Sequence, residues 1–552
     1  MASIQPYTGV LGKRLAKHLL RRTSYRYTPT QIDTMAGQTS TAAINALFNI
    51  PAPSMTEPID YVSGQPWINS GVNNDRPGGL DNFEERRSVI AWWQREALLD
   101  PSIGSKMTFF LHSNYVVSAD PVSPAQYFDY LQLLGFYAIG NFKTLAKKIT
   151  VDTAMLRYLN GNLNERDNPN ENYAREFLEL FTIGKGPQIG PGDYTNYTEA
   201  DIVTAARVLT GWRPTWDRPI GGNNDHRDPD TGITRGRPGF WAHDLNNKTF
   251  SPAFNNTTII AATNETEMFR ELDDFVEMVF AQPETARNIC RKLYRYFVSS
   301  NITQEIETDI IAPLALTFAN NNYELEPVLR QLLMSQHFYD LDDNDSENEF
   351  VGGTIKSPFE ALAQTMTFFN IPEPDPILDG ENHYFRWYYL TVDLVITKAA
   401  GMGMFQPENV AGYAAYYQEP SYDKNWFGGS TLIARYKLPE ILLTGQRILS
   451  WGGDNGGVQL NISQWMANSG VVADPADAEA LVNNMIDYLL PETPEPARYL
   501  YFLNDVFLDE LSTINWRFEW IGYENSGNDS SVKIPLERLF TALISSQEFQ
   551  NN

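Results

Sequence analysis

The densest group of polar side chains lies in residues 168–184, which read NPNENYAREFLELFTIG. At helical spacing, Glu171, Arg175 and Glu179 fall on one arc, and Glu176 lies beside them. Neighbouring carboxylates can act as a general acid or base or bind a divalent cation, and an arginine can orient an anionic group. The alternative is a solvated face of ion pairs, each contributing about a few tenths of a kcal/mol. The sequence leaves both interpretations open.

A second polar segment, YTEADIVTAARVLTGW at 197–212, follows closely. Thr198 and Asp201 have the spacing of a capping box, which predicts a helix that begins here. Arg207 points away from the predicted apolar stripe, on the same side as Glu199. We therefore predict that Arg207 is either buried between two helices and paired with Glu176 or Glu179, or simply exposed to solvent.

Two of the six histidines lie where they could transfer protons. His112 ends the apolar run MTFFLH, where a hydrogen-bonded interior histidine is the more common situation. His243 and Asp244 follow a long loop, and such a pair suits a metal site or a proton-transfer site. The predicted catalytic candidates are Glu176, Glu179, Arg175, Arg207, His112, His243 and Asp244.

Helices must position these side chains, because apolar residues recur mostly at helical spacing and strand signals are scarce and short. Thr28 to Gln31 forms a capping box with proline at the first helical position. Helices are predicted at about 10–22, 83–99, 104–116, 125–138, 142–160, 170–182, 199–210, 266–281, 284–299, 303–320, 324–336, 355–370, 475–489, 495–512 and 535–548.

Long irregular stretches separate these helices, and loops of such length often have a function. They are predicted at 51–80, 213–257, 339–350 and 371–384. Aromatic residues are frequent in two further segments, 384–389 and 413–426, which we predict to be loops. Exposed aromatic loops can bind a protein partner or a glycan.

The chain contains an internal repeat. PETAR at 283–287 recurs as PEPAR at 494–498, and SQHF at 335–338 recurs as SQEF at 546–549, both with an offset of 211 residues. The shared offset favours two related helical subdomains over a chance match of helix ends. We predict a mainly α, multi-helical globular protein with long loops, divided into parts at 1–260, 261–350, 351–470 and 471–552.

Composition excludes several classes of protein. A net charge of −26 disfavours nucleic acid and anionic membranes as partners, and 42% hydrophobic residues indicate a folded chain rather than a disordered one. The N-terminal residues include basic side chains but no uninterrupted apolar stretch, so neither a signal peptide nor a membrane span is predicted. This pattern favours an intracellular chain or one whose targeting segment has been removed.

Familiar catalytic and metal-binding motifs are missing from the sequence. It has no GxSxG, GxxxxGK[ST] or HExxH motif, and the acidic loops at 228–232 and 342–346 lack the spacing of an EF-hand. The single cysteine, Cys290, has the spacing of a core residue in a predicted helix. We expect Cys290 to be buried and unreactive.

The same polar segments resemble a known bacterial family, the domain of unknown function 1800. NENYARE followed by LTGW is the most specific combination, and the resemblance extends over nearly the whole chain. The segments that carry it are RLAKHLLRR (14–22), FFLH (109–112), GNF (140–142), NENYARE (170–176), YTEAD and ARVLTGW (197–212), HDLNNKT (243–249), TAR (285–287), KSP (356–358), QPENVAG (406–412) and GGSTLIARY (428–436).

The resemblance implies a mostly helical protein, but the family has no established biochemical activity. Its members are frequently exported and often encoded beside a phosphatase-like family, so the resemblance implies export, whereas the N-terminal residues favour an intracellular chain. Members commonly have a second histidine where this chain has Asn114, which weakens a metal site built on two histidines here. The resemblance also raises the expectation of one buried polar cluster, formed by Glu171, Arg175, Glu176, Glu199, Arg207, His243 and Asp244.

Two functional hypotheses remain. The first is an enzyme with a hydrolase-type acid/base or divalent-metal site, in which Glu176 or Glu179 is the base or ligand and His112 or His243 transfers protons. The second is a non-catalytic envelope or secretion-associated scaffold that binds a protein or glycan through its aromatic loops. The sequence does not determine the substrate or the oligomeric state.

Overall fold

Capping interactions start several helices where the sequence predicts them. The computed structural model describes residues 2–50, 56–68, 82–215, 226–342, 351–445 and 459–552. At the start of the second helix, the Thr28 hydroxyl accepts a hydrogen bond from the Gln31 backbone N–H, and the Gln31 side chain accepts one from the Thr28 N–H. This reciprocal pair satisfies two donors that the first helical turn leaves free.

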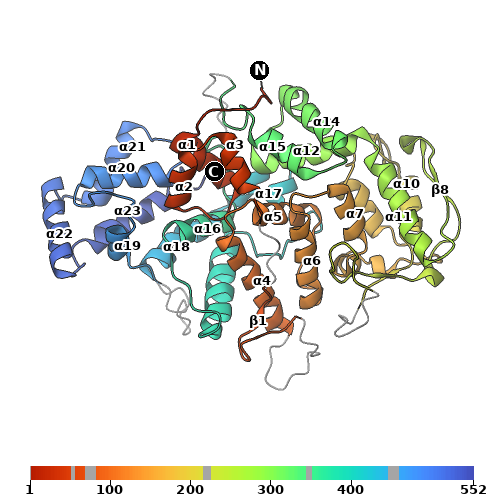
Figure 1. Ribbon diagram of the computed structural model, residues 1–552, viewed down its shortest axis with the longest axis horizontal. Helices are drawn as coiled ribbons and strands as arrows, with labels where there is room; N and C mark the ends of the chain where they lie inside the picture. Colours follow the sequence, from red (N-terminus) through yellow and green to blue (C-terminus); the bar gives the residue numbers. More distant parts are fainter. Residues whose placement is uncertain (1, 51–55, 69–81, 216–225, 343–350, 446–458) are drawn as a thin grey trace.

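Helices dominate the first half of the chain and surround a continuous core (Figure 1). They are α1 (Gly12–Thr23), α2 (Pro29–Ala36), α3 (Ser40–Leu47), α4 (Asn82–Leu99), α5 (Gly104–Asn114), α6 (Pro124–Phe136), α7 (Phe142–Thr150), α8 (Thr153–Tyr158), η1 (Gly161–Leu163), α9 (Asn172–Glu176), η2 (Phe177–Phe181), α10 (Glu199–Val208), η3 (Phe240–Ala242) and η4 (Pro252–Phe254).

The second half is also helical, and its last helices lie at one end of the long axis. The elements are α11 (Glu265–Phe280), α12 (Pro283–Phe297), α13 (Gln304–Ile306), η5 (Glu307–Ile311), α14 (Ala312–Asn320), α15 (Leu325–Leu333), α16 (Pro358–Phe368), η6 (Glu381–Lys398), α17 (Ala414–Tyr417), η7 (Tyr422–Trp426), α18 (Gly429–Thr444), α19 (Ile462–Asn468), α20 (Ala478–Leu489), α21 (Pro496–Leu500), η8 (Tyr501–Leu508), α22 (Thr513–Ser526) and α23 (Lys533–Ser545).

Within the described residues, strands form only short antiparallel pairs, which agrees with the predicted mainly α class. Trp212 pairs with Pro238 and Lys248 with Ile259, so these pairs hold together the long irregular segment after α10. The pairs are β1 (Ile59–Asp60) with β2 (Gln65–Pro66), β3 (Gln188–Gly190) with β4 (Asp193–Tyr194), β5 (Trp212–Arg213) with β6 (Arg237–Pro238), and β7 (Lys248–Thr249) with β8 (Thr258–Ile259).

Several of the predicted loops and helices differ from the structure. Segment 413–426, predicted to be a loop, contains α17 and η7, and the short helices α3 and α19 were not predicted. Residues 384–389 are not a loop, because they lie inside the π-type helix η6. Helix α18 was not predicted, and it contains Pro439, a residue that usually interrupts a helix. Helix α22 was also missed, because it has apolar residues on both faces: Trp516 is fully buried while Phe518 is 70% exposed. Cys290 is buried in the core as predicted.

Helix α1 connects the N-terminal part to the C-terminal part. The Lys17 ammonium donates to the carbonyls of Asp487 and Leu490, at 2.6 and 2.8 Å, at the end of α20. Arg21 donates to the Leu489 carbonyl at 2.6 Å. Helix C-terminal carbonyls carry partial negative charge, so these cations take the place of solvent and cap the helix.

The two predicted repeat units end in the same way. Ser335 Oγ donates to the Leu332 carbonyl and accepts from the Phe338 N–H, at 2.7 and 3.0 Å. Ser546 Oγ makes the corresponding bonds to Leu543 and Phe549, at 2.7 and 3.2 Å. The order of helices is also similar in the two units. When 211 is added to the first residue numbers of α11, α12, α13 and α15, the results lie within three residues of the starts of α20, α21, α22 and α23. Common ancestry of the units and the domain boundaries stay predictions.

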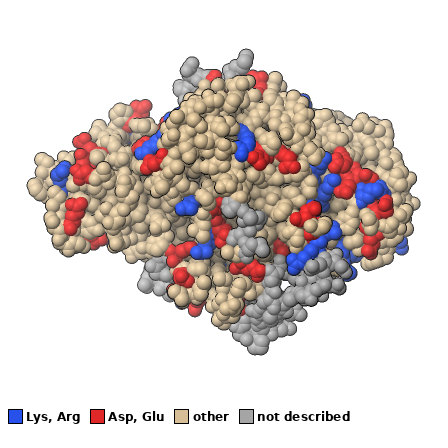
Figure 2. Space-filling model, viewed as in Figure 1, with Lys and Arg blue, Asp and Glu red and all other residues tan. Residues whose placement is uncertain are grey.

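Acidic and basic side chains alternate over the face seen in Figure 2, with uncharged surface between them. The described ranges contain no helix that is both long and apolar enough to cross a membrane.

Candidate functional site

The helix that carries the predicted acidic cluster changes its hydrogen-bond pattern in the middle. The α-helical α9 continues as the π-type turn η2, which holds one extra residue per turn and so rotates the side chains that follow. Arg175 binds Glu199 at 2.5 and 3.0 Å and Glu171 at 3.1 Å. Glu179 instead pairs with Lys185. The predicted Glu171, Arg175 and Glu179 ladder therefore has its first pair but not its second.

Glu176 is the predicted acid with the most altered ionisation. Its carboxyl group is half-buried and makes no hydrogen bond within the described residues. Burial, and secondarily the negative charge of Glu179, raise the pKa of Glu176 to about 7. Glu179 accepts a hydrogen bond from the Tyr197 hydroxyl at 3.3 Å. Glu176 can therefore gain or lose a proton near neutral pH.

His243 lies in a fully buried polar group whose partners come from the turn after α10, from β7 and from α11. Its Nδ1 donates to the Thr210 carbonyl at 2.8 Å, and its Nε2 lies 3.0 Å from Glu271 Oε2. Glu271 also forms an ion pair with Lys248 and accepts from the Ala262 N–H at 2.8 Å. Both ring nitrogens are thus occupied by protein partners, which leaves His243 no free atom for proton transfer to a substrate.

Arg207 pairs with Asp244, and the predicted pairing with Glu176 or Glu179 is wrong. The guanidinium binds both carboxylate oxygens, at 2.8 and 3.3 Å. Thr210 Oγ1 accepts from the Asp244 N–H at 2.8 Å, so the end of α10 fixes this pair. The arginine and its hydrogen bonds hold the pKa of Asp244 below its usual range against the effect of burial. The pair ties α10 to the segment that follows η3.

His112 is fully buried and hydrogen-bonded through one ring nitrogen. Its Nδ1 donates to the Tyr130 hydroxyl at 2.9 Å, and that hydroxyl donates to the Tyr115 carbonyl at 2.6 Å. Nε2 has no partner among the described residues, and the ring packs edge to face against Phe405. Burial lowers the pKa of His112 to about 3, so it remains neutral at physiological pH.

The hydrogen bonds thus place the predicted residues in separate groups rather than in one cluster. One group contains Arg175, Glu171 and Glu199. A second contains Glu179, Lys185 and Tyr197. The groups around His243 and His112 are separate from these two. The described part of the chain holds no group of three or more His, Cys, Asp or Glu side chains that could bind a metal ion.

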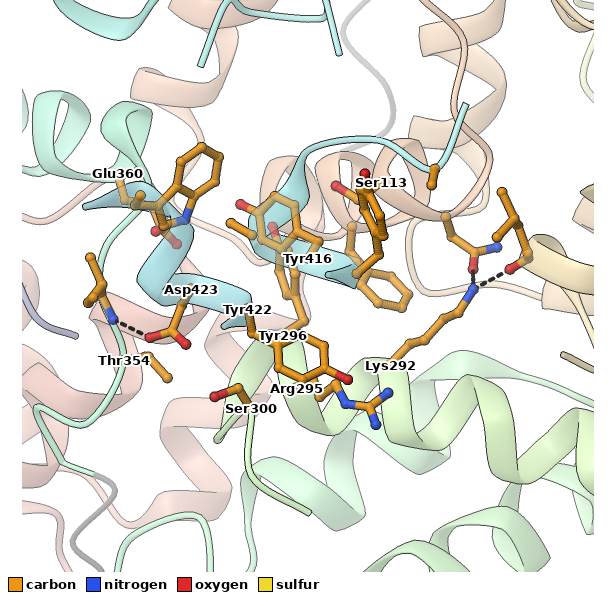
Figure 3. A pocket seen from close by; sticks show the side chains of 18 of the residues that line it. Ser113, Lys292, Arg295, Tyr296, Ser300, Thr354, Glu360, Tyr416, Tyr422 and Asp423 are labelled. Atoms are coloured by element: carbon orange, nitrogen blue, oxygen red, sulfur yellow. Dashed lines mark hydrogen bonds between the residues drawn. The ribbon is translucent and has the colours of Figure 1, made fainter. Parts of the chain in front are cut away.

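A pocket lies where α5, η2, α12 and the segment 410–426 meet (Figure 3). Its volume is about 160 Å³. Glu179 is the predicted site residue that lines it. Thr354 and Glu360 close it on one side, and Asn552 contributes from the last described residues. Cavities with apolar walls and a few convergent polar groups are the usual form of a small-molecule site.

Aromatic rings form the middle of the pocket. Tyr416, Tyr422 and Trp426 come from α17 and η7, within the aromatic segment 413–426, and Tyr296 comes from α12. The Tyr416 and Trp426 rings are 5.8 Å apart, edge to face, and the Tyr296 and Tyr416 rings are 5.5 Å apart. This packing fixes the rings against one another before any ligand binds.

Two cations of α12 lie on one side of the pocket (Figure 3). The Lys292 ammonium donates to Asn114 Oδ1 at 2.6 Å and to the Leu180 carbonyl. Burial, with a contribution from Arg295, lowers the pKa of Lys292 to about 7. The Arg295 guanidinium lies over the Tyr422 ring, 5.0 Å from its centre, and makes no hydrogen bond within the described residues.

Asp423 lies on the other side of the pocket. One carboxylate oxygen, Oδ2, accepts from the Ile355 N–H at 2.9 Å. The other, Oδ1, is buried and has no hydrogen-bond partner in the described part of the chain. A buried carboxylate oxygen without a donor is costly, so a ligand hydroxyl or N–H group would be favoured there.

The family model described as Protein of unknown function (DUF1800) matches residues 18–551. The chain belongs to the DUF1800 family. No curated protein and no solved structure matches it significantly.

Several segments that carry the DUF1800 resemblance meet at this pocket. Val410 and Ala411 of QPENVAG line it, and the KSP segment lies just before Glu360. Asn114, at the position where DUF1800 members commonly have histidine, binds Lys292. Three lining residues, Lys292, Arg295 and Asp423, were not predicted, although the aromatic segment 413–426 indicated one wall.

Proposed function

We propose that the protein binds a hydroxylated ring compound of the carbohydrate class in the pocket between α5, α12 and the segment 410–426. The observation that carries the proposal is the unpartnered Oδ1 of Asp423 beside a fixed group of aromatic rings. A sugar ring has an apolar face of C–H groups that can lie on an aromatic ring, and hydroxyl groups at its edge that can donate to a carboxylate. This pairing of surfaces favours a sugar over a wholly apolar ligand.

The proposal is tested by binding measurements on the full chain. Titration calorimetry with a panel of monosaccharides and short oligosaccharides, together with the fluorescence of Trp426 and the other tryptophans, detects binding. We expect Asp423→Asn to weaken binding at least tenfold, because the Ile355 N–H retains the one amide oxygen and the NH2 donor then replaces the acceptor Oδ1. Asp474→Asn, at an exposed ion pair with Arg517, serves as the control and should bind as the wild type does. Equal affinity of Asp423→Asn and wild type would contradict the assignment.

A second candidate function is hydrolysis with Glu176 as the general acid or base. It is supported by the raised pKa of Glu176, about 7, and by the position of Glu179 at the pocket. Activity on chromogenic glycosides and esters should show a pH dependence centred near 7 that Glu176→Gln abolishes. Glu171→Gln, in the exposed ion pair with Arg175, should leave the rate unchanged. A rate unaffected by Glu176→Gln would reject this role.

The expectations about export, a scaffold role and a protein partner stay predictions, as does the expected lack of nucleic-acid binding. The carbohydrate proposal favours the binding hypothesis over the enzyme hypothesis, because it rests on the lining of the pocket rather than on the predicted proton-transfer histidines. His112 and His243 are engaged with protein partners and have no part in it.

A further inference from the structure

The carboxylates that line the pocket have cationic neighbours at its edges. Glu179 forms an ion pair with Lys185, and Glu360 forms one with the buried Lys106. The negative charge of Asp423 acts favourably on the buried guanidinium of Arg22. The negative charges of the pocket walls are therefore compensated within the protein.

The basic side chains of the pocket, in contrast, have no carboxylate of the described residues within hydrogen-bond distance. Lys292 donates to a side-chain amide oxygen and a backbone carbonyl, both of which are uncharged. Arg295 lies 3.8 Å from Glu419, beyond hydrogen-bond distance, and the Glu419 side chain is 73% exposed. An ion pair with so exposed a partner is weak. Two basic side chains, Lys292 and Arg295, therefore face the pocket without a hydrogen-bonded carboxylate from the part of the chain that the structure describes.

Lys292 and Arg295 lie three residues apart on α12 and therefore on the same face of the helix. Two like charges at this spacing repel each other, and the cost increases as they lose solvent. An anion bound between them would remove this repulsion and accept hydrogen bonds from the third ammonium proton and from the guanidinium.

We propose that the ligand of this pocket carries an anionic group, a carboxylate or a phosphate, that binds between Lys292 and Arg295. The inference rests on the proposed function and names the kind of carbohydrate: a sugar acid or a sugar phosphate. Figure 3 shows Asp423 on the side of the pocket opposite Lys292, with Tyr296, Tyr416 and Tyr422 between them. The ligand therefore lies with its acidic group towards α12, its ring on the tyrosines and a hydroxyl group donating to Asp423.

The test compares neutral sugars with their acidic counterparts. Titration calorimetry measures the binding of glucose, galactose and mannose, of the three corresponding uronic acids and of their 6-phosphates, with inorganic phosphate alone as a further probe. In at least one of the three series, we expect the acidic sugar to bind at least tenfold more tightly than the neutral one. Preference for the uronic acid or for the 6-phosphate identifies which anionic group the pocket accepts.

Variants of α12 locate the preference. Lys292→Gln and Arg295→Gln each keep a hydrogen-bond donor but remove the charge. Each variant should reduce the preference for the acidic sugar at least tenfold. Lys292→Arg keeps the charge and should retain most of the preference. Arg287→Met, on the exposed side of the same helix, is the control and should leave the preference unchanged. Circular dichroism and thermal melting establish that each variant is folded.

The outcomes separate the two proposals. If neutral and acidic sugars bind equally well, or if the preference survives in Lys292→Gln and Arg295→Gln, the anion site is wrong while the carbohydrate pocket stands. If no sugar of either kind binds to the folded wild-type chain, the carbohydrate proposal fails and the anion site fails with it. Binding of inorganic phosphate alone as tightly as the sugar phosphate would overturn the role of the tyrosine rings.

Discussion

Glu271 and Glu277 lie on the same helix, α11, in opposite environments. Glu271 is fully buried between His243 and Lys248, whereas the Glu277 side chain is 52% exposed beside Lys143 and Lys147. We expect Glu271→Gln to lower the free energy of unfolding by about 3–5 kcal/mol, because it leaves the buried ammonium of Lys248 without its counter-charge. Chemical denaturation of the variant and the wild type measures the difference.

Glu277→Gln is the matched control for this measurement. It removes the same charge from the same helix but at an exposed ion pair, so we expect a loss below about 1 kcal/mol. A loss that is equally small in Glu271→Gln would mean that the buried group around His243 does not stabilise the fold.

At the residue scale, the sequence indicated which polar side chains could form a site, but it did not indicate which of them contact one another. His243, Asp244 and Arg207 were all identified as candidates, and two of them bind each other. The partner of His243, Glu271, was not identified, because it lies in an ordinary amphipathic helix. Spacing along a chain predicts neighbours on one helix, whereas contacts between helices depend on packing that a single sequence does not specify.

At the scale of elements, the contact between α1 and α20 makes stability depend on pH. Burial, with Arg21 nearby, lowers the pKa of Lys17 to about 7, whereas an unfolded lysine titrates near 10.5. Between these values the unfolded chain binds more protons than the folded one, so the contribution of Lys17 to stability increases as the pH rises from 7 to 10. We expect the stability difference between wild type and Lys17→Met to shift by about 2 kcal/mol in favour of wild type over this range.

Lys13→Met provides the comparison, because Lys13 lies on the same helix but is partly exposed and paired with Asp487 at 2.8 Å. Its pKa is raised by Asp487, so its removal should not reproduce the trend from pH 7 to 10. Urea denaturation of the three proteins at several pH values measures the effect. Parallel pH profiles of wild type and Lys17→Met would show that the buried ammonium is not the cause.

The sequence predicted most helices but not their irregular turns. The capping boxes at Thr28 and Thr198 are present, because a cap is a local interaction that four residues determine. The π-type turn η2 was not predicted, and it changed the partner of Glu179 from Arg175 to Lys185. The extra residue in this turn depends on how the helix packs against the rest of the protein. The periodicity of apolar residues in the sequence does not report that packing.

At the scale of the whole molecule, the sequence predicted the helical class, but it did not predict the pocket. The lining residues extend from Phe110 to Asn552, so the pocket exists only where distant parts of the chain meet. The aromatic segment 413–426 was identified, whereas Lys292 and Arg295 lie in an amphipathic helix in which surface cations are common. The folded structure, not the local sequence, determines that neither side chain has a hydrogen-bonded carboxylate partner among the described residues.

Because this pocket takes its walls from such separate stretches of sequence, ligand binding reports on the folding of the whole chain. The bond from Lys356 to the Phe549 carbonyl, 2.6 Å long, and the backbone pairing of Ile355 with Asn551 bring the last residues beside Thr354 and Glu360. A folding intermediate that lacks these contacts has no complete binding site. A ligand therefore selects fully assembled molecules and, by mass action, slows their loss to unfolding, proteolysis or aggregation.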